Sequence, residues 1–175
     1  NIYAMQGNFE EALKHYQHSL EISMELGNKV DISGSYGAVG YAKFSLGNYS
    51  EAIQNYSLAL KYAREANDNI VLSETYIGLG DVNSKMENDS MALNYYFNAL
   101  KLQEEAGNKE QIPLIYNSVA LIYMKQKKFN ASADNLKKAL AFANEIGSLA
   151  YIKMSYENWT SLDSARENYS MALEH

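Results

Sequence analysis

The chain contains no cysteine and only one proline among its 175 residues. Without thiols it can form neither disulfides nor thiolate metal sites. The scarcity of proline is compatible with helix along most of the chain, because proline breaks helices at interior positions. With 47% hydrophobic residues and no low-complexity segment, the composition is that of a folded protein. Covalent cross-links therefore play no part in the fold.

Long apolar runs and an excess of positive charge are missing as well. No run approaches the ~18 residues that a membrane span requires. The net charge is −6 and is spread along the chain, whereas a nucleic-acid partner would require a basic stripe. We therefore expect no membrane segment in this chain and no nucleic-acid partner. We expect a cytoplasmic location, with the periplasm as the alternative.

Motifs for catalysis and metal binding are also absent. The sequence has no phosphate-binding glycine loop, nucleophile elbow, zinc-protease helix motif or calcium loop. His15 and His18 are three residues apart, and on a helix they could share a metal. They lie opposite the predicted apolar face, however, and we expect no carboxylate companion there. We therefore predict an exposed helix surface at these histidines, no cofactor and no enzymatic activity.

One pattern is present, and it returns every 40 residues. Residues 47–60 read GNYSEAIQNYSLAL, residues 7–20 read GNFEEALKHYQHSL, and residues 87–100 read ENDSMALNYYFNAL. A divergent fourth copy occupies residues 127–140, and residues 167–173 begin a fifth. Similarity at a fixed period indicates a repeat array, in which each repeat packs only on its neighbours.

Helix boundaries recur at the same interval. Residues that tolerate the left-handed conformation are each followed by a good helix N-cap. They are Gly27, Asn67, Gly107 and Gly147, followed by Asn28, Asp68, Asn108 and Ser148. A second series contains Gly7 and Gly47, and the pairs Asn8–Glu11 and Asn48–Glu51 have the spacing of a capping box.

Two boundaries per period predict two antiparallel helices per repeat. We predict first helices near 29–46, 69–86, 109–126 and 149–165, and second helices near 9–26, 49–66, 89–106 and 129–146. Pro113 lies inside one of these segments, so that helix should start late or bend.

Apolar residues fall on one face of each predicted helix. In a second helix this face consists of Ala52, Ile53, Tyr56, Ala59, Leu60 and Ala63; in the first helices it contains Tyr36, Val39 and Gly40, then Tyr76, Leu79 and Gly80, then Tyr116, Val119 and Ala120. Small residues such as Gly40 and Gly80 should let two helices approach closely, with tyrosine rings filling the space beside them.

These residues resemble the tetratricopeptide repeats, in which an aromatic residue, Leu-Gly and Tyr in one helix precede Ala and an aromatic residue in the next. One copy has Tyr36, Val39, Gly40, Ala52 and Tyr56, and the following copy has Tyr76, Leu79, Gly80, Ala92 and Tyr96. The chain departs from the family at Lys43, Asn83 and Asp163, where Tyr is preferred. It also lacks the closing proline, and its period exceeds the common 34. The longer period resembles arrays of kinesin light chains, G-protein-signalling scaffolds, bacterial peptide-pheromone regulators and bacterial sensor proteins.

The resemblance implies an all-α, right-handed α-solenoid of antiparallel helix hairpins. It would form one array over residues 1–175, a fragment of a longer chain. The repeats would span residues 29–68, 69–108 and 109–148, between partial repeats 1–28 and 149–175. We expect self-association through the cut ends, where apolar residues lose their neighbours: Ile2, Tyr3, Leu13 and Tyr16 at the start, Trp159 and Leu162 at the end.

The resemblance also implies a non-catalytic scaffold that binds a protein or peptide on its concave wall, as the sensor or interaction region of a larger bacterial signalling protein. The alternative is a peptide-pheromone or small-ligand receptor that drives an attached output domain. The predicted wall residues are Tyr41, Phe44, Glu74, Ile77, Asp81, Lys85, Asn117, Leu121, Met124, Lys125, Met154 and Glu157. If the array's own helices fully bury Tyr41, Phe44, Leu121 and Met124, no groove of this kind exists.

Overall fold

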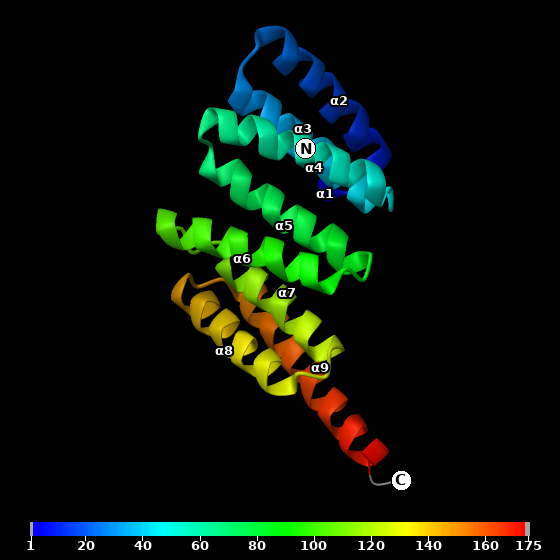
Figure 1. The fold of residues 1–175 in the computed structure, drawn as a ribbon, viewed down its shortest axis with the longest axis vertical. Coiled ribbons are helices and arrows are strands. Elements are labelled where there is room, and N and C mark those ends of the chain that lie inside the picture. Colours follow the sequence, from blue (N-terminus) through cyan, green and yellow to red (C-terminus); the bar gives the residue numbers. More distant parts are fainter. Residues whose placement is uncertain (1, 174–175) are drawn as a thin grey trace. The chain divides into compact units, whose positions relative to one another are not determined.

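A computed structural model describes residues 2–173, and it describes side chains up to residue 167. Every regular element in this part of the chain is an α-helix, and within each compact unit described below successive helices run antiparallel (Figure 1). The helices are α1 (Ile2–Met5), α2 (Phe9–Leu26), α3 (Lys29–Ser45), α4 (Tyr49–Ala66), α5 (Asn69–Lys85), α6 (Asp89–Ala106), α7 (Ile112–Lys125), α8 (Phe129–Glu145) and α9 (Leu149–Leu173). The predicted all-α array of helix hairpins is confirmed. For α2 to α6 and for α8, the predicted bounds agree to within one residue.

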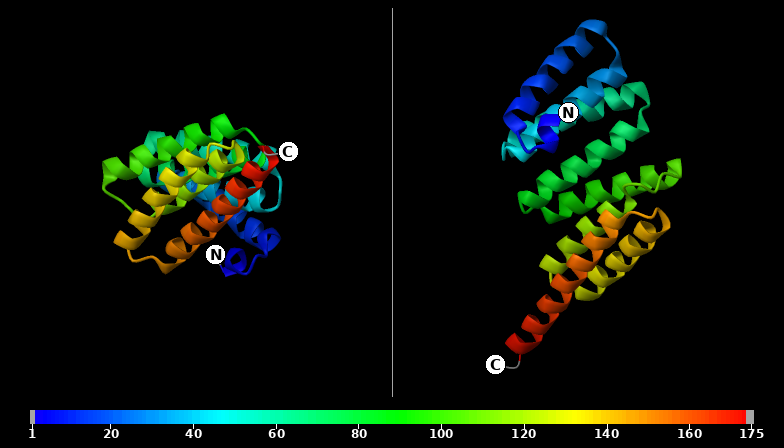
Figure 2. Two further views of the ribbon diagram at one scale, coloured as in Figure 1. Left: turned by 90° about the horizontal axis from the view of Figure 1, so that it is seen from below. Right: turned by 180° about the vertical axis from the view of Figure 1, so that it is seen from behind.

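The helices are grouped in two compact units, residues 1–102 and residues 103–175. In the N-terminal unit α2 packs on α3, α3 on α4 and α4 on α5, and α3 also lies beside α5. In the C-terminal unit α7, α8 and α9 all contact one another (Figure 2). First helices of successive repeats are therefore neighbours within each unit.

The turns between helices share one backbone geometry. Positive φ angles occur at Gly7, Gly27, Gly47, Asn67, Glu87, Gly107, Lys127 and Gly147. At one of these turns the Gly47 N–H donates to the Phe44 carbonyl and the Asn48 N–H donates to the Lys43 carbonyl, both at 2.9 Å. These bonds satisfy carbonyls at the end of α3 that would otherwise lack partners. The predicted left-handed positions are confirmed, and Glu87 and Lys127 adopt the same conformation without being glycine.

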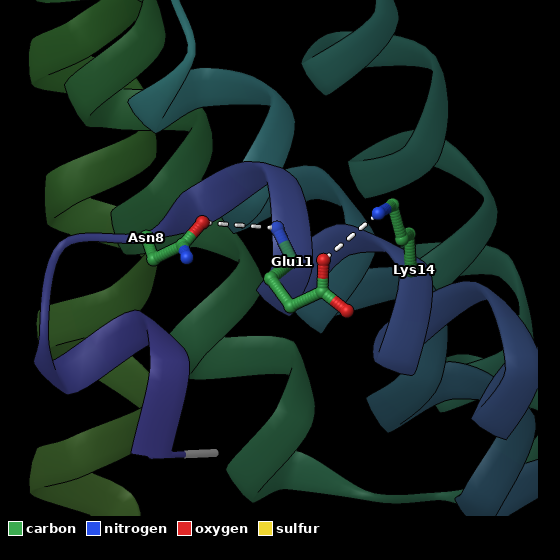
Figure 3. Close-up of polar contacts among 3 residues, drawn as sticks. All are labelled: Asn8, Glu11 and Lys14. Carbon is green, nitrogen blue, oxygen red and sulfur yellow. Dashed lines mark hydrogen bonds and ion pairs between the residues drawn. The ribbon is translucent and has the colours of Figure 1, made fainter.

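At the start of α2, one of the two hydrogen bonds of the predicted capping box forms (Figure 3). The Asn8 side chain accepts a hydrogen bond from the Glu11 N–H at 3.2 Å. The Glu11 carboxylate pairs with the Lys14 ammonium at 2.8 Å instead of reaching back to the cap. The reason is that the Asn8 N–H already donates to the Tyr3 carbonyl, at 2.9 Å.

At the start of α4 the predicted capping box is wrong. The Asn48 side chain makes no capping hydrogen bond. The Glu51 carboxylate lies 2.6 Å from the Lys43 ammonium. Because the Asn48 N–H is engaged in the preceding turn, a charge pair is the stronger use of the Glu51 carboxylate.

Two helices differ from the simple repeat. Helix α7 starts late, at Ile112, with Pro113 in its first turn, where the missing N–H costs no hydrogen bond. This confirms the prediction for Pro113. Helix α9 continues to Leu173, so the predicted end near residue 165 and the new helix after Glu167 are wrong (Figure 2). The backbone of α9 stays helical at the position where the earlier repeats turn, so its N–H and C=O groups remain paired within one helix.

The core of the N-terminal unit uses the predicted close packing of tyrosine on glycine. Tyr56 is buried among apolar residues of α4 and α5. A Cβ atom added to Gly40 would lie 2.8 Å from Tyr56 Cδ1, and one added to Gly80 would lie 2.5 Å from Tyr96 Cε1. Bulkier residues at these glycines would therefore displace the rings.

The core of the C-terminal unit contains Ala120, Ala133, Leu136 and Leu162, with Trp159 packed against it. Leu162 is 0% exposed, so the expectation that it lacks covering neighbours is wrong. Helices α7 and α8 supply the other residues of this cluster and cover it.

Candidate functional site

A pocket of about 370 Å³ opens on the N-terminal unit, with walls formed by α3 and α5. Tyr56 of α4 contributes to its lining from the core side. Five of the predicted wall residues meet in this pocket: Tyr41, Phe44, Glu74, Ile77 and Asp81. Lys85, the sixth candidate in this unit, is exposed on α5 and does not line the pocket.

Glycines make the pocket hollow. A Cβ atom added to Gly34 or Gly37 of α3 would meet no atom within 4 Å. Gly78 of α5 differs, because its added Cβ would lie 2.5 Å from Tyr56 Cζ and 2.7 Å from the Tyr56 hydroxyl. The α3 glycines therefore open the space, and the α5 glycine admits the Tyr56 ring.

Two carboxyl groups give the pocket negative charge. Burial raises the pKa of Asp81, while a 2.6 Å hydrogen bond from the Tyr96 hydroxyl and the charge of Lys85 partly offset this effect. Glu74 lies at the exposed edge, yet surrounding atoms desolvate its carboxyl and raise its pKa, and Asp68 adds to the shift. Within the part of the chain whose side chains are described, neither carboxylate forms an ion pair, and no Lys, Arg or His lines the pocket.

The Tyr56 hydroxyl is a further polar group at the pocket. Tyr56 is 4% exposed, and its hydroxyl hydrogen-bonds to no residue among those with described side chains. Burial raises its pKa, and the nearby Asp81 and Tyr41 raise it further, so the hydroxyl stays protonated and can donate. Sequence reasoning missed this group by assigning Tyr56 only to the core. The available signal was Gly78, a helical glycine with no turn to explain it.

The aromatic residues of the pocket differ in exposure. Tyr41 is 45% exposed, and its ring meets Phe9 edge-on with centroids 5.8 Å apart. Phe44 is half-buried, packs against the core and lies 5.9 Å from the Tyr49 ring. Tyr41 is therefore available to a ligand, whereas Phe44 also supports the fold.

A second pocket of about 470 Å³ adjoins the first and shares Gly34, Ala38 and Val71 with it. Its other lining residues are Tyr16, Ser19, Ser23, Val30, Asp31 and Ser35. Because the two pockets share these residues and both are lined by α3, we describe them together as the α3 groove. It offers an acidic, aromatic end and a hydroxyl-rich end.

In the C-terminal unit, Asn117 is a packing residue and is unavailable to a ligand. It is 1% exposed, and its Nδ2 donates to the Pro113 carbonyl and to Ser155 Oγ, both at 2.9 Å. Its Oδ1 accepts from Asn158 Nδ2 at 2.8 Å. The side chain joins α7 to α9, and its amide is fully used there, so the structure removes it from the predicted wall.

The other candidates of the C-terminal unit are partly accessible. Leu121 is 41% exposed, and Lys125 is exposed. Met154 is half-buried, and Glu157 is exposed and lies 3.7 Å from the Lys153 ammonium. Met124 packs against the core cluster of this unit, so its removal would also affect stability.

The two histidines are exposed, as predicted. The His15 ring stacks on Tyr3 with centroids 5.1 Å apart. The expectation that they lack a carboxylate companion is wrong, because His18 Nδ1 lies 3.6 Å from Glu21 Oε2. No cluster of three or more metal-ligating side chains occurs among the residues with described side chains.

None of the helices within residues 2–173 combines the length and the hydropathy needed to cross a bilayer.

Known structures share this fold. BtubC (BKLC) from P. vanneervenii is 20% identical with a TM-score of 0.77, over 90% of this chain and 66% of that one. Aspartyl phosphate phosphatase F from Bacillus subtilis is 16% identical with a TM-score of 0.85, over 98% of this chain and 46% of that one. A kinesin light chain-like protein from Podosopora anserina with nearly identical TPR-like repeats is 13% identical with a TM-score of 0.68, over 97% of this chain and 87% of that one.

At these identities the likeness is one of fold alone, and the chain spans less than two thirds of the first two proteins. No curated protein matches the sequence. Sequence models described as tetratricopeptide repeat match residues 31–105 and residues 1–26, which together are more than half of the chain. With helix hairpins at a constant period and tyrosines packed on helical glycines, the chain belongs to the tetratricopeptide repeat family.

Proposed function

We propose that this chain is a non-catalytic binding module that holds an extended peptide, or an extended segment of a protein, in the α3 groove. Tetratricopeptide repeats are protein-interaction repeats, which supports this class of function. The observation that carries the proposal is the pocket between α3 and α5, where the half-exposed ring of Tyr41 stands beside two carboxylates.

The groove suits an extended ligand because it consists of two adjoining pockets on rigid helices. Pockets of this size accept a single side chain or a small ligand. A chain that crosses Gly34 and Ala38 would place one side chain in each pocket. Binding is favoured over catalysis because the first pocket has no histidine, cysteine or lysine to act beside its carboxylates.

In the same proposal, the chain is the sensor or interaction region of a larger signalling protein. One observation also favours the alternative of a peptide-pheromone or small-ligand receptor with an attached output domain. The first pocket places polar groups in a space of about 370 Å³, within the range of small-molecule sites. Aspartyl phosphate phosphatase F, of which this chain spans 46%, is a larger protein with the same fold in the shared part.

Peptide selection tests the proposal. A displayed library of random peptides is selected on the chain, and the recovered peptides are titrated by calorimetry into the wild type and into Gly37→Leu. A Cβ atom at this position meets open space, so the leucine side chain should extend into the pocket and occupy it. Gln54→Leu, on the exposed side of α4, controls for an added surface leucine.

We expect Gly37→Leu to weaken peptide binding at least about tenfold, because a filled pocket excludes one anchoring side chain. Gln54→Leu should bind like the wild type. Failure to recover any binding peptide, or equal affinity for wild type and Gly37→Leu, would contradict the proposal.

A further inference from the structure

The acidic end of the α3 groove carries two carboxyl groups, and Lys85, which does not line the pocket, offsets only part of the effect of burial on Asp81. Glu74 and Asp81 are seven residues apart on α5, so they lie on one helix face, and both line the same pocket. Neither forms an ion pair among the residues with described side chains. Asp81 accepts one hydrogen bond, from Tyr96, and a carboxylate can accept about four. Two acceptors with unused capacity therefore face a space without a cation.

A second observation comes from a different helix. Tyr56 of α4 is only 4% exposed, and its hydroxyl reaches the pocket beside Gly78. It has no hydrogen-bond partner within the part of the chain that has described side chains. The Tyr56 side chain is nearly buried, and its hydroxyl lies at the pocket surface, where it can donate a hydrogen bond to a bound group. A bound group that interacts with Asp81 would lie close to this hydroxyl.

The rest of the pocket suits the stem of a long cationic side chain. Val71 and Ile77 supply apolar surface, and Tyr41 presents a half-exposed ring. Lysine and arginine combine an aliphatic stem with a charged end, and aromatic faces attract that charge. An anionic side chain would meet two carboxylates and be repelled.

We propose that the pocket between α3 and α5 recognises the ammonium or guanidinium group of a lysine or arginine side chain in the bound peptide. This inference rests on the proposed function and specifies the chemistry of its ligand. Glu74 and Asp81 bind the cation, Tyr41 covers it, and the Tyr56 hydroxyl bonds to a polar atom of the same peptide.

Small probes test the pocket separately from any particular peptide. Butylguanidinium, butylammonium and neutral pentanamide are titrated into the ¹⁵N-labelled chain, and the backbone amides of Gly37 and Gly78 are followed by NMR. We expect saturable shifts at both glycines for the two cations, with affinities at least about fivefold higher than for pentanamide. Equal affinity for pentanamide would overturn the inference.

Matched variants assign the effect to the carboxylates. The double variant Glu74→Gln and Asp81→Asn should abolish the preference for cations, while the amide oxygen introduced by the second substitution can still accept the Tyr96 hydrogen bond. The double variant Glu10→Gln and Glu25→Gln removes the same charge from exposed positions of α2 and should keep the preference. A cation preference that persists in the first double variant would contradict the assignment.

Tyr56→Phe tests the hydroxyl at the pocket surface. Because this hydroxyl has no partner among the residues with described side chains, its removal should leave the melting temperature unchanged or higher. The same variant should bind the selected peptides at least about threefold more weakly. A lower melting temperature with unchanged affinity would show that the hydroxyl serves the fold.

The peptide selection separates the two proposals. If peptides bind in the groove but contain lysine and arginine no more often than the starting library, the cation inference fails and the binding function stands. If the bound peptides are insensitive to Gly37→Leu, the proposed function itself fails.

Discussion

At the scale of single residues, two glycines of the same pocket have opposite structural roles. Gly37 faces open space, and Gly78 contacts the Tyr56 ring. Gly37→Ala should stabilise the fold by about 0.5–1 kcal/mol, because alanine is the better helix former. Gly78→Ala should destabilise it by about 1–3 kcal/mol, because the new Cβ would overlap a buried ring. Urea denaturation of both variants measures these changes, and effects of the same sign would contradict the packing described.

Some residues of the candidate site could be predicted from the sequence, and others could not. Tyr41, Glu74 and Asp81 could be placed on the wall because helical periodicity determines which face a residue occupies. The contribution of Tyr56 could not, because periodicity does not tell how far a long side chain reaches through the core. Asn117 was misplaced because its partner Ser155 lies 38 residues away, on a helix whose packing the sequence does not specify.

At the scale of elements, two carboxyl groups of α5, those of Asp81 and Glu74, make the stability of the fold depend on pH. Their pKa values are raised in the folded state, so the folded chain keeps these protons to higher pH than the unfolded chain. Stability from these groups is therefore lost as pH rises from the ordinary carboxyl range through the raised pKa values. Burial raises the pKa of Asp81, the hydrogen bond from Tyr96 of α6 and the charge of Lys85 lower it, and Asp81 in turn raises the pKa of Tyr56 of α4.

The prediction is best measured as a difference. The Asp81→Asn variant has no titratable carboxyl group at this position. The free energy of unfolding of the wild type, measured relative to this variant, should therefore rise as the pH is lowered from 7 through the raised pKa of Asp81. Urea denaturation over a pH series of both proteins measures this quantity. A difference that falls on acidification would mean that the folded state lowers the pKa of Asp81.

The turn between α7 and α8 contains removable strain. Lys127 has a φ of 59°, a conformation that disfavours residues with a Cβ atom. Lys127→Gly should raise the free energy of unfolding by about 1 kcal/mol, after part of the gain is lost to the greater freedom of glycine in the unfolded chain. Lys137→Gly, at an exposed interior position of α8, should lower it by about 1 kcal/mol. Thermal denaturation of the two variants measures both changes in stability. Similar losses of stability in the two variants would contradict the proposed strain at Lys127.

Packing of α6 gives a further prediction. Ala92 is 0% exposed, so Ala92→Leu should cost about 1–3 kcal/mol through overpacking. Lys61→Leu, on the exposed side of α4, should cost little. Differential scanning calorimetry measures both, and equal losses of melting temperature would mean that the buried face is misassigned.

Element boundaries could be predicted because turn residues and caps recur at the period of the array. The start of α7 followed from the chemistry of Pro113. The length of α9 did not follow, because Glu167 stands where Glu87 turns, and the same residue type turns at one position and stays helical at the other. A local pattern therefore does not decide between a turn and continued helix at this residue.

At the scale of the whole molecule, the repeat period determines the family and the hairpin fold, whereas the proposed binding function depends on how one surface departs from the repeat. Gly37 and Gly78 have no glycine 40 residues further along the chain, since Ile77 and Ser118 stand at the corresponding positions. These two glycines form the pocket with Asp81 and Glu74. The groove is therefore a local feature of the N-terminal unit and does not follow from the repeat pattern itself.

The most direct measurement is an NMR footprint of a selected peptide on the ¹⁵N-labelled chain. We expect the largest amide shifts on α3 and α5, around Gly34, Gly37 and Gly78, and we expect Gly37→Leu to remove them. Peptide binding that leaves these amides unchanged and perturbs other helices would contradict the central claim that the α3 groove is the binding site.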